Sequence, residues 1–374
     1  MKFFLARVNA AFIRASLRLV PNSPGLHLKL GTSLHETGKA EQAHGVLLKA
    51  VSLAPDTSKT HFALGSCLAT LGCLSEARVA FARARRLEPS NPEIAFALGN
   101  IYFECAEIDL AVRAYEGAIR IRPDYARAYF NLGHAFKEKG WLRQAASAFR
   151  RALVVQPRFY KARFMLAYVY ALMDLNDEAI QQYRLTIQAS PSYVKAHYNL
   201  GNCYLKKGQV SLALDAYSTI LELEPKHARA HFAIGQSLAR RGRLAEALSS
   251  FQEALSVKTD FPECNLAYAR ALEAVGRVRE AIHHYLAFLN DPGSLEQRAE
   301  VEAHVALLTL SASHTGRREA TDRHAAFDAE VARRDVTGRF RARREATGEF
   351  LQITAEPSLS SLQGPQDTLD SSSS

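Results

Sequence analysis

The sequence predicts an all-α solenoid made of repeated helix pairs, because one pattern of residues recurs along most of the chain. An apolar residue followed by Gly or Ala returns every 34 residues, eight times in register. Two helical stretches fit within one such period, and a period of this length is typical of helical repeat proteins. The eight pairs are Leu30-Gly31, Leu64-Gly65, Leu98-Gly99, Leu132-Gly133, Leu166-Ala167, Leu200-Gly201, Ile234-Gly235 and Tyr268-Ala269.

Four further columns keep the same phase when the small residue of each pair is numbered position 8. Position 20 is Ala in every repeat: Ala43, Ala77, Ala111, Ala145, Ala179, Ala213, Ala247 and Ala281. Position 24 is large: Leu47, Phe81, Tyr115, Phe149, Tyr183, Tyr217, Phe251 and Tyr285. Position 15 is Gly in six repeats: Gly38, Gly72, Gly140, Gly208, Gly242 and Gly276. Position 32 is Pro in six: Pro55, Pro89, Pro123, Pro157, Pro191 and Pro225.

These columns place each helix within the repeat. Gly at position 15 permits the positive φ that ends the first helix of a pair. Pro at position 32 ends the second helix, since proline cannot continue the hydrogen-bonded ladder. Small residues at positions 8 and 20 let the two helices approach closely, and the large residue at position 24 fills the space around that contact. We therefore expect two short helices per repeat, packed through these positions.

The repeats resemble the tetratricopeptide repeat (TPR), and the resemblance covers residues 24–295. It implies eight helix-turn-helix units that form a right-handed superhelical solenoid with capping helices. Solenoids offer a long surface rather than one globular core with a deep catalytic cavity. The resemblance therefore favours a scaffold that binds other proteins.

The N-terminal stretch departs from the repeat pattern. Residues 1–23 are expected to form a capping helix, the second helix of a degenerate leading repeat, because Pro21 lies 34 residues before Pro55 and Leu17 falls in an apolar column. The stretch is basic and has no acidic residue, so mitochondrial targeting by residues 1–20 is an alternative to a cytoplasmic location.

The C-terminal stretch also departs from the pattern. Residues 296–336 are expected to contain further helices, whereas residues 337–374 combine a basic segment with a Ser-rich tail that has too little apolar surface to fold. The net charge is +9, and arginines gather between residues 333 and 344. A basic tail can hold phosphates, so nucleic acid is an alternative ligand, although acidic residues lie nearby and no nucleic-acid motif occurs.

No catalytic motif is found, so we expect a protein that is not an enzyme and needs no cofactor or metal. The five cysteines are unevenly spaced without a C-x-x-C pair, which supports neither a zinc site nor a disulfide framework. No apolar run approaches the ~20 residues that a membrane span needs. Histidines recur at position 4, but they are 34 or more residues apart, so helix packing explains them better than a metal. They are His27, His61, His197 and His231.

The first helix of each repeat carries the candidate binding residues. By resemblance to TPR proteins, positions 2, 5, 9 and 12 line the concave groove, and spacings of three and four residues put them on one helical face. Position 2 is basic in five repeats: Lys59, Arg127, Lys161, Lys195 and Arg229. Position 5 is aromatic in six: Phe62, Phe96, Phe130, Phe164, Tyr198 and Phe232. Polar candidates at positions 6 and 9 are Asn100, Asn131, His134, Asn199 and Asn202.

These columns predict a groove for a peptide or a partner protein with acidic residues near apolar anchors. The cations would attract the acids, and the aromatic rings would supply desolvated contacts. Cations at a helix start oppose the helix dipole, which favours a functional reason for them. The alternative for the aromatic column is packing between helices, since each ring can also contact the neighbouring helix.

A narrower resemblance connects the repeats to the superhelix of O-GlcNAc transferase-like proteins, through segments such as 128–133 and 195–201. That family places asparagines at position 6 along its groove, whereas only Asn131 and Asn199 occupy this position here. The residues after the repeats are too few for a sugar-nucleotide domain. The alternative function is therefore a non-catalytic repeat half, or relative, of such a glycosyltransferase that acts with a separate catalytic partner.

Overall fold

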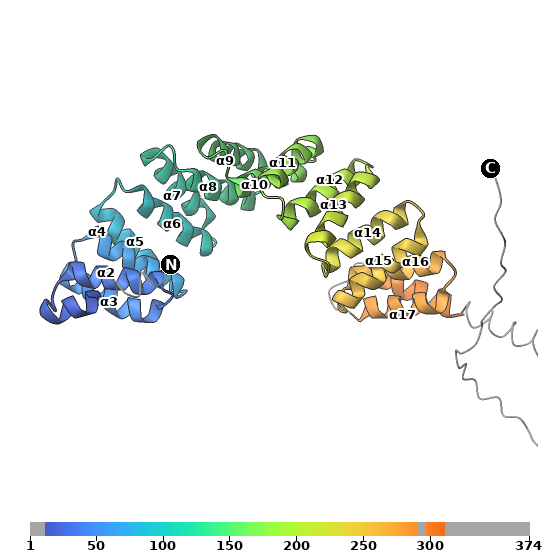
Figure 1. The fold of residues 1–374 in the computed structure, drawn as a ribbon, viewed down its shortest axis with the longest axis horizontal. Helices are drawn as coiled ribbons and strands as arrows, with labels where there is room; N and C mark the ends of the chain where they lie inside the picture. The colour runs from blue at the N-terminus through green and yellow to red at the C-terminus, as the bar shows by residue number, and fades with distance from the viewer. Residues whose placement is uncertain (1–11, 291–296, 311–374) are drawn as a thin grey trace, which may run out of the picture. The chain divides into compact units, whose positions relative to one another are not determined.

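The computed structural model describes residues 12–290 and 297–310, and every regular element in these ranges is a helix. Sixteen helices between Pro24 and Leu289 form eight pairs, which follow one another in chain order from blue to orange in Figure 1. The all-α solenoid expected from the 34-residue period is therefore confirmed.

The helix boundaries repeat with the same period. The first helices are α2 (Pro24–Glu36), α4 (Ser58–Thr70), α6 (Pro92–Glu104), α8 (Ala126–Glu138), α10 (Tyr160–Leu172), α12 (Val194–Lys206), α14 (Ala228–Arg240) and α16 (Pro262–Ala274). The second helices are α3 (Ala40–Leu53), α5 (Leu74–Leu87), α7 (Ile108–Ile121), α9 (Leu142–Val155), α11 (Asn176–Ala189), α13 (Val210–Leu223), α15 (Leu244–Val257) and α17 (Val278–Leu289).

The two helices of a pair meet where position 8 faces position 24. A Cβ atom on Gly133 would lie 2.7 Å from Cε1 of Phe149, and one on Gly99 would lie 2.5 Å from Cε1 of Tyr115. Such distances are too short for non-bonded carbons, so a side chain at these glycines would have to displace the facing ring. The position-20 residue Ala145 is fully buried at the same contact. In the two repeats without glycine the residue at position 8 is the next smallest, alanine, at Ala167 and Ala269. The sequence-based account of positions 8, 20 and 24 is confirmed.

Every repeat ends its first helix with a left-handed residue at position 15. The six glycines of that column have φ between 72° and 81°. In the two repeats without glycine, Ala106 and Asp174 adopt the same conformation, with φ of 60° and 57°. The chain therefore keeps the turn even where the residue makes it costly, since a side chain in the left-handed region crowds the backbone.

In four repeats a position-4 histidine ties the first helix to the turn before it. Nε2 of His61 lies 2.7 Å from the carbonyl oxygen of Pro55, and Nε2 of His197 lies 2.8 Å from that of Pro191. His27 and His231 repeat this contact, and Arg163 donates to the Pro157 carbonyl in the same way. These histidines have structural roles, as expected. Within the described ranges no cluster of His, Cys, Asp and Glu could hold a metal ion.

Consecutive repeats pack through the second helix of one and the first helix of the next. First helices of neighbouring repeats also touch, as α2 does with α4 and α6 with α8. Among the described residues exposed ion pairs cross four junctions between repeats: Arg83 pairs with Asp56 at 3.0 Å, Arg78 with Glu107 at 3.0 Å, Lys139 with Asp109, and Lys206 with Asp174 at 2.8 Å. Each repeat thus contacts its neighbours, and the first helices form a continuous surface.

The ends of the chain are described only in part. Residues 12–19 form a helix, and Leu17 packs against the core of the first repeats. The helix at residues 297–310 belongs to a second compact unit. The basic segment and the Ser-rich tail lie outside the described residues. None of the helices in the described ranges is long and apolar enough to span a membrane.

Replacing Gly133 by Leu should destabilise the stack, because the new side chain would collide with the buried Phe149 ring. We expect a loss of about 1–3 kcal/mol or more in the free energy of unfolding. Denaturant unfolding measures the loss, and hydrogen exchange should show it first in α8 and α9. Gly45→Leu is the matched control, because a Cβ there meets nothing within 4 Å. Equal damage from both substitutions would contradict the close-contact explanation.

Replacing Ala106 by Gly should stabilise the protein, because glycine adopts positive φ without the steric cost that alanine has. The expected gain is about 1 kcal/mol in the free energy of unfolding. The reverse substitution, Gly140→Ala, should lose a similar amount at the equivalent turn. Thermal unfolding of both variants checks the pair, and changes of the same sign would rule out the explanation.

Candidate functional site

The exposed side of the first helices, which we name the first-helix face, carries positions 2, 5, 6 and 9. Its basic column is exposed to solvent. The position-2 side chains Lys59, Arg127, Lys161, Lys195 and Arg229 are all exposed. Among the described residues none of these five pairs with a carboxylate, although ten ion pairs form elsewhere. The column is therefore an uncompensated row of positive charge.

The aromatic column at position 5 lies deeper than the cations. Phe130 packs between Phe149 of its own repeat, at 5.7 Å between ring centroids, and Phe159 before the next repeat, at 4.9 Å. Phe96 and Phe164 are only 7% and 8% exposed. Phe62, Phe130, Tyr198 and Phe232 are half-buried, so parts of their rings reach the surface. Helix packing thus accounts for much of this column, and its role in binding remains a prediction.

A further aromatic column at position 34 supports these rings, and the sequence analysis missed it. Tyr125, Phe159, Tyr193 and Phe261 each lie 4.9–5.1 Å, centroid to centroid, from the position-5 ring of the preceding first helix. The column could have been found from the same 34-residue phase. It falls after the proline that ends the repeat, where a turn rather than a packed helix was expected.

Cations of one repeat lie beside rings of the preceding repeat. The Arg127 guanidinium carbon is 5.4 Å from the centroid of the Phe96 ring. Burial raises the pKa of the Tyr198 phenol, and the nearby Arg229 guanidinium acts in the opposite direction. Positions 2 and 5 therefore meet across the junction between repeats rather than within one helix.

Two of the candidate asparagines meet across a junction. Nδ2 of Asn131 donates to Oδ1 of Asn100 at 2.7 Å, and the Tyr115 hydroxyl donates to the same oxygen at 2.9 Å. Asn202 accepts from the Tyr217 hydroxyl at 2.6 Å. Asn199 instead donates to the Lys195 carbonyl of its own helix. The position-9 asparagines are thus held in place by the buried tyrosines at position 24.

His134 occupies position 9 in the fourth repeat, among aromatic rings. Its imidazole lies 4.6 Å from the Phe130 ring and 5.5 Å from the Phe149 ring, both edge-to-face. Burial lowers the pKa of His134 to about 4, and the positive charge of Lys137 acts in the same direction. The imidazole is therefore neutral at physiological pH, and it contributes a polar ring rather than a charge to the first-helix face.

The first-helix face has a hollow between α14 and α16, with a volume of about 380 Å³. Four alanines, among them Ala239 and Ala271, leave the space open, and Phe251 lies at its base. Arg240 and Arg270 line it as well. The sequence analysis did not select these arginines, because neither position 9 nor position 13 is basic in most repeats. The charged residues that line the hollow are both cationic.

Comparison with known families agrees with this architecture. Models described as tetratricopeptide repeat match residues 28–92, 126–159 and 198–262, and a model described as TPR repeat matches residues 99–140 and 176–208. The chain belongs to the TPR family. A search of curated proteins gave no match.

Solved TPR structures share the fold. The C-terminal part of a TPR repeat-containing protein from Cytophaga hutchinsonii aligns with a TM-score of 0.53 and 20% identity, over 62% of this chain and 97% of that one. YrrB, titled a TPR protein with an unusual peptide-binding site, aligns with a TM-score of 0.45 and 21% identity, over 53% of this chain and 98% of that one. At these identities the likeness concerns the TPR fold alone.

The depressed pKa of His134 predicts a pH-dependent contribution to the stability of the TPR stack. The unfolded chain binds a proton at this imidazole near pH 6.5 and the folded chain only near pH 4. The contribution is therefore complete above about pH 6.5 and is lost as the pH falls toward 4, by roughly 3 kcal/mol at most. His134→Gln should flatten this part of the stability curve, because Gln236 occupies the same position beside Phe251 in another repeat. Urea unfolding at several pH values checks it, and parallel curves for both proteins would contradict it.

Proposed function

We propose that this TPR protein is a non-catalytic adaptor that binds an acidic peptide segment of a partner protein along the first-helix face. The uncompensated cation row at position 2 is the observation that carries the proposal. Four of its members lie in four consecutive repeats, at Arg127, Lys161, Lys195 and Arg229, and all four are exposed. A surface that holds like charges in a row without counter-ions is suited to an acidic partner.

The neighbouring rings favour a partner that combines acidic and apolar residues. Arg127 lies against the Phe96 ring, and Arg229 lies close enough to Tyr198 to affect its pKa. A carboxylate bound at Arg229 would lie beside the half-buried Tyr198 ring. Apolar side chains next to the acids of the peptide would cover that ring and be removed from water.

The asparagine pair supports recognition of the peptide backbone. Asn131 uses its Nδ2, and Asn100 its Oδ1, in the hydrogen bond that joins them. The Asn100 amide nitrogen and the Asn131 amide oxygen are left as one donor and one acceptor on the first-helix face. A peptide group of an extended ligand offers the complementary carbonyl and N–H. The pair would hold the ligand without regard to its sequence, while the cations would select acidic segments.

The hollow between α14 and α16 extends the basic surface beyond the cation row. Position 2 is acidic in the last repeat, at Glu263, and Arg240 and Arg270 supply positive charge there instead. The TPR fold itself is typical of protein-interaction scaffolds, which agrees with this use of the surface. An acidic segment that crosses the fourth to the eighth repeat would therefore meet a cation in each of them.

The proposal is tested by reversing the charge of the cation row. The variant Lys161→Glu, Lys195→Glu, Arg229→Glu should lose partners that the native chain captures in a pull-down, and capture by the native chain should weaken with added salt. Arg150→Glu, Arg151→Glu, Arg184→Glu is the matched control, because it changes the net charge equally on exposed residues of the second helices α9 and α11. Circular dichroism verifies that both variants remain helical. Identical partner sets for the native chain and the first variant would overturn the proposal, as would equal losses in both variants.

A further inference from the structure

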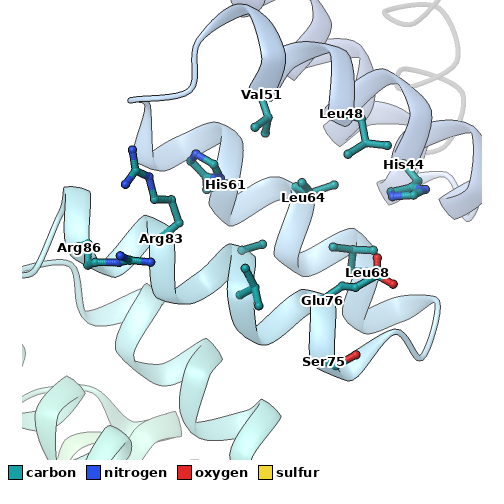
Figure 2. Close-up of a pocket in the computed structure, with 12 residues that line it drawn as sticks. His44, Leu48, Val51, His61, Leu64, Leu68, Ser75, Glu76, Arg83 and Arg86 are labelled. Carbon is teal, nitrogen blue, oxygen red and sulfur yellow. The ribbon is translucent and has the colours of Figure 1, made fainter.

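An apolar groove opens on the opposite side of the repeat from the cation row, between the first two repeats. Helices α3 and α5 form its walls, α4 forms its floor, and its volume is about 550 Å³ (Figure 2). Leu48 and Val51 project from one wall, Val79 and Ala80 belong to the other, and Leu64 lies on the floor. Leu48 and Val79 are 47% and 66% exposed, so the groove presents aliphatic surface to solvent.

This groove arises where the repeats differ from one another. Leu48 occupies position 25 and Val79 position 22 of their repeats. The next six repeats carry polar residues at position 22: Arg113, Ser147, Gln181, Asp215, Ser249 and His283. Position 11 on the floor is Leu68 here, whereas the following four repeats have a larger ring: Tyr102, Phe136, Tyr170 and Tyr204. The same departures from the repeat both open the groove and make its walls apolar.

We propose that this groove is a second docking site, which takes an amphipathic helix of a partner protein with acidic residues at one end. The site goes beyond the adaptor function proposed above, because none of its residues belongs to the cation row or the first-helix face. Its size lies within the ~300–1,000 Å³ typical of binding pockets. It would give the protein two separate surfaces for two different partner segments.

A helix suits the groove better than an extended peptide, because the walls have no free backbone groups to offer as hydrogen-bond partners. The backbone groups of α3, α4 and α5 are used within those helices, so an extended peptide would bury N–H and C=O groups without partners. A helix satisfies its own backbone. The floor residues His61, Leu64 and Leu68 span seven positions, or about 10.5 Å of helix. The i, i+3 or i+4, and i+7 side chains of a bound helix have the same spacing.

Positive charge at one end of the groove is the reason to expect acidic residues at one end of the bound helix. Figure 2 shows Arg83 and Arg86 together at one end, with Ser75 and Glu76 at the other. Arg83 pairs at 3.0 Å with Asp56, whose side chain is 79% exposed. Arg86 is exposed and, within the described part of the chain, has no ion pair. Carboxylates on the end of the bound helix would meet these guanidinium groups in charge-assisted hydrogen bonds.

The test uses a display library of 18-residue helix-forming peptides with randomised surface positions. The native chain is the bait, and the variant Leu48→Ser, Val79→Ser is added in excess as a soluble competitor that removes peptides binding elsewhere. This variant should fold, because serine occupies position 22 or 25 in other repeats, at Ser147, Ser218 and Ser249. Selected peptides should carry an apolar i, i+3/i+4, i+7 stripe with Asp or Glu at one end.

Fluorescence anisotropy then measures the selected peptides one at a time. Binding should weaken about tenfold or more in Leu48→Ser, Val79→Ser and in Arg86→Glu, because each change removes a buried or charged contact. Val154→Ser, at a valine on α9 that is 71% exposed, is the matched control and should bind like the native chain. The Lys161→Glu, Lys195→Glu, Arg229→Glu variant should also bind normally, which separates this site from the first-helix face.

Three results would overturn the proposal. The library could yield no peptide that distinguishes the native chain from the competitor, or it could yield peptides whose charged end is basic. The third is self-association: if sedimentation shows a dimer of the native chain that Leu48→Ser, Val79→Ser abolishes, a second copy of the chain occupies the groove.

Discussion

The structure depends on one contact, the approach of position 8 to the large side chain at position 24. Because a Cβ at Gly99, Gly133 or Gly201 would lie within 2.7 Å of the facing ring, the close approach of the paired helices in these repeats depends on the lack of a side chain. The ring held there is buried, and the hydroxyls of Tyr115 and Tyr217 donate to the position-9 residues Asn100 and Asn202. Core packing thereby orients polar groups on the first-helix face, as the bond from Tyr115 to Asn100 shows. Candidate binding residues and core residues are consequently coupled at Asn100 and Asn202.

The fold could be predicted almost completely from the sequence, because periodicity reports what all repeats share. The end of each first helix was expected from the glycines at position 15, and Ala106 and Asp174 show that the constraint comes from the repeat rather than from glycine itself. The histidines at position 4 were expected to pack, yet their hydrogen bond to the preceding Pro carbonyl was not foreseen. That hydrogen bond joins residues of adjoining repeats, and the recurrence of a residue type at one repeat position does not show which atoms it contacts.

The candidate sites were less predictable, because they depend on features that the repeats do not share. The exposed cations follow from their column, but the depth of the position-5 rings depends on the position-34 rings that pack on them, such as Phe159 on Phe130. Arg240, Arg270 and the groove beside Leu48 and Val79 belong to no column, because they occur where single repeats deviate. In a repeat protein the shared residues specify the scaffold, whereas the deviations individualise its surface. A search for recurrent positions therefore finds the scaffold residues and overlooks the surface residues in which single repeats deviate.

The ties between neighbouring repeats are not all of one chemical kind. A histidine-to-carbonyl hydrogen bond or its arginine equivalent links the turn and the helix at His61, Arg163, His197 and His231. The junctions entered by α6 and α8 have Ala95 and Tyr129 at that position, and exposed ion pairs, Arg78 with Glu107 and Lys139 with Asp109, cross them instead. Salt screens exposed ion pairs and hardly affects hydrogen bonds to a carbonyl. Ion pairs also cross the junctions entered by α4 and α12, where the histidine hydrogen bond remains, and the hydrogen bond from Asn131 to Asn100 remains at the junction entered by α8. Added salt should therefore loosen the side-chain ties most between the second and third repeats.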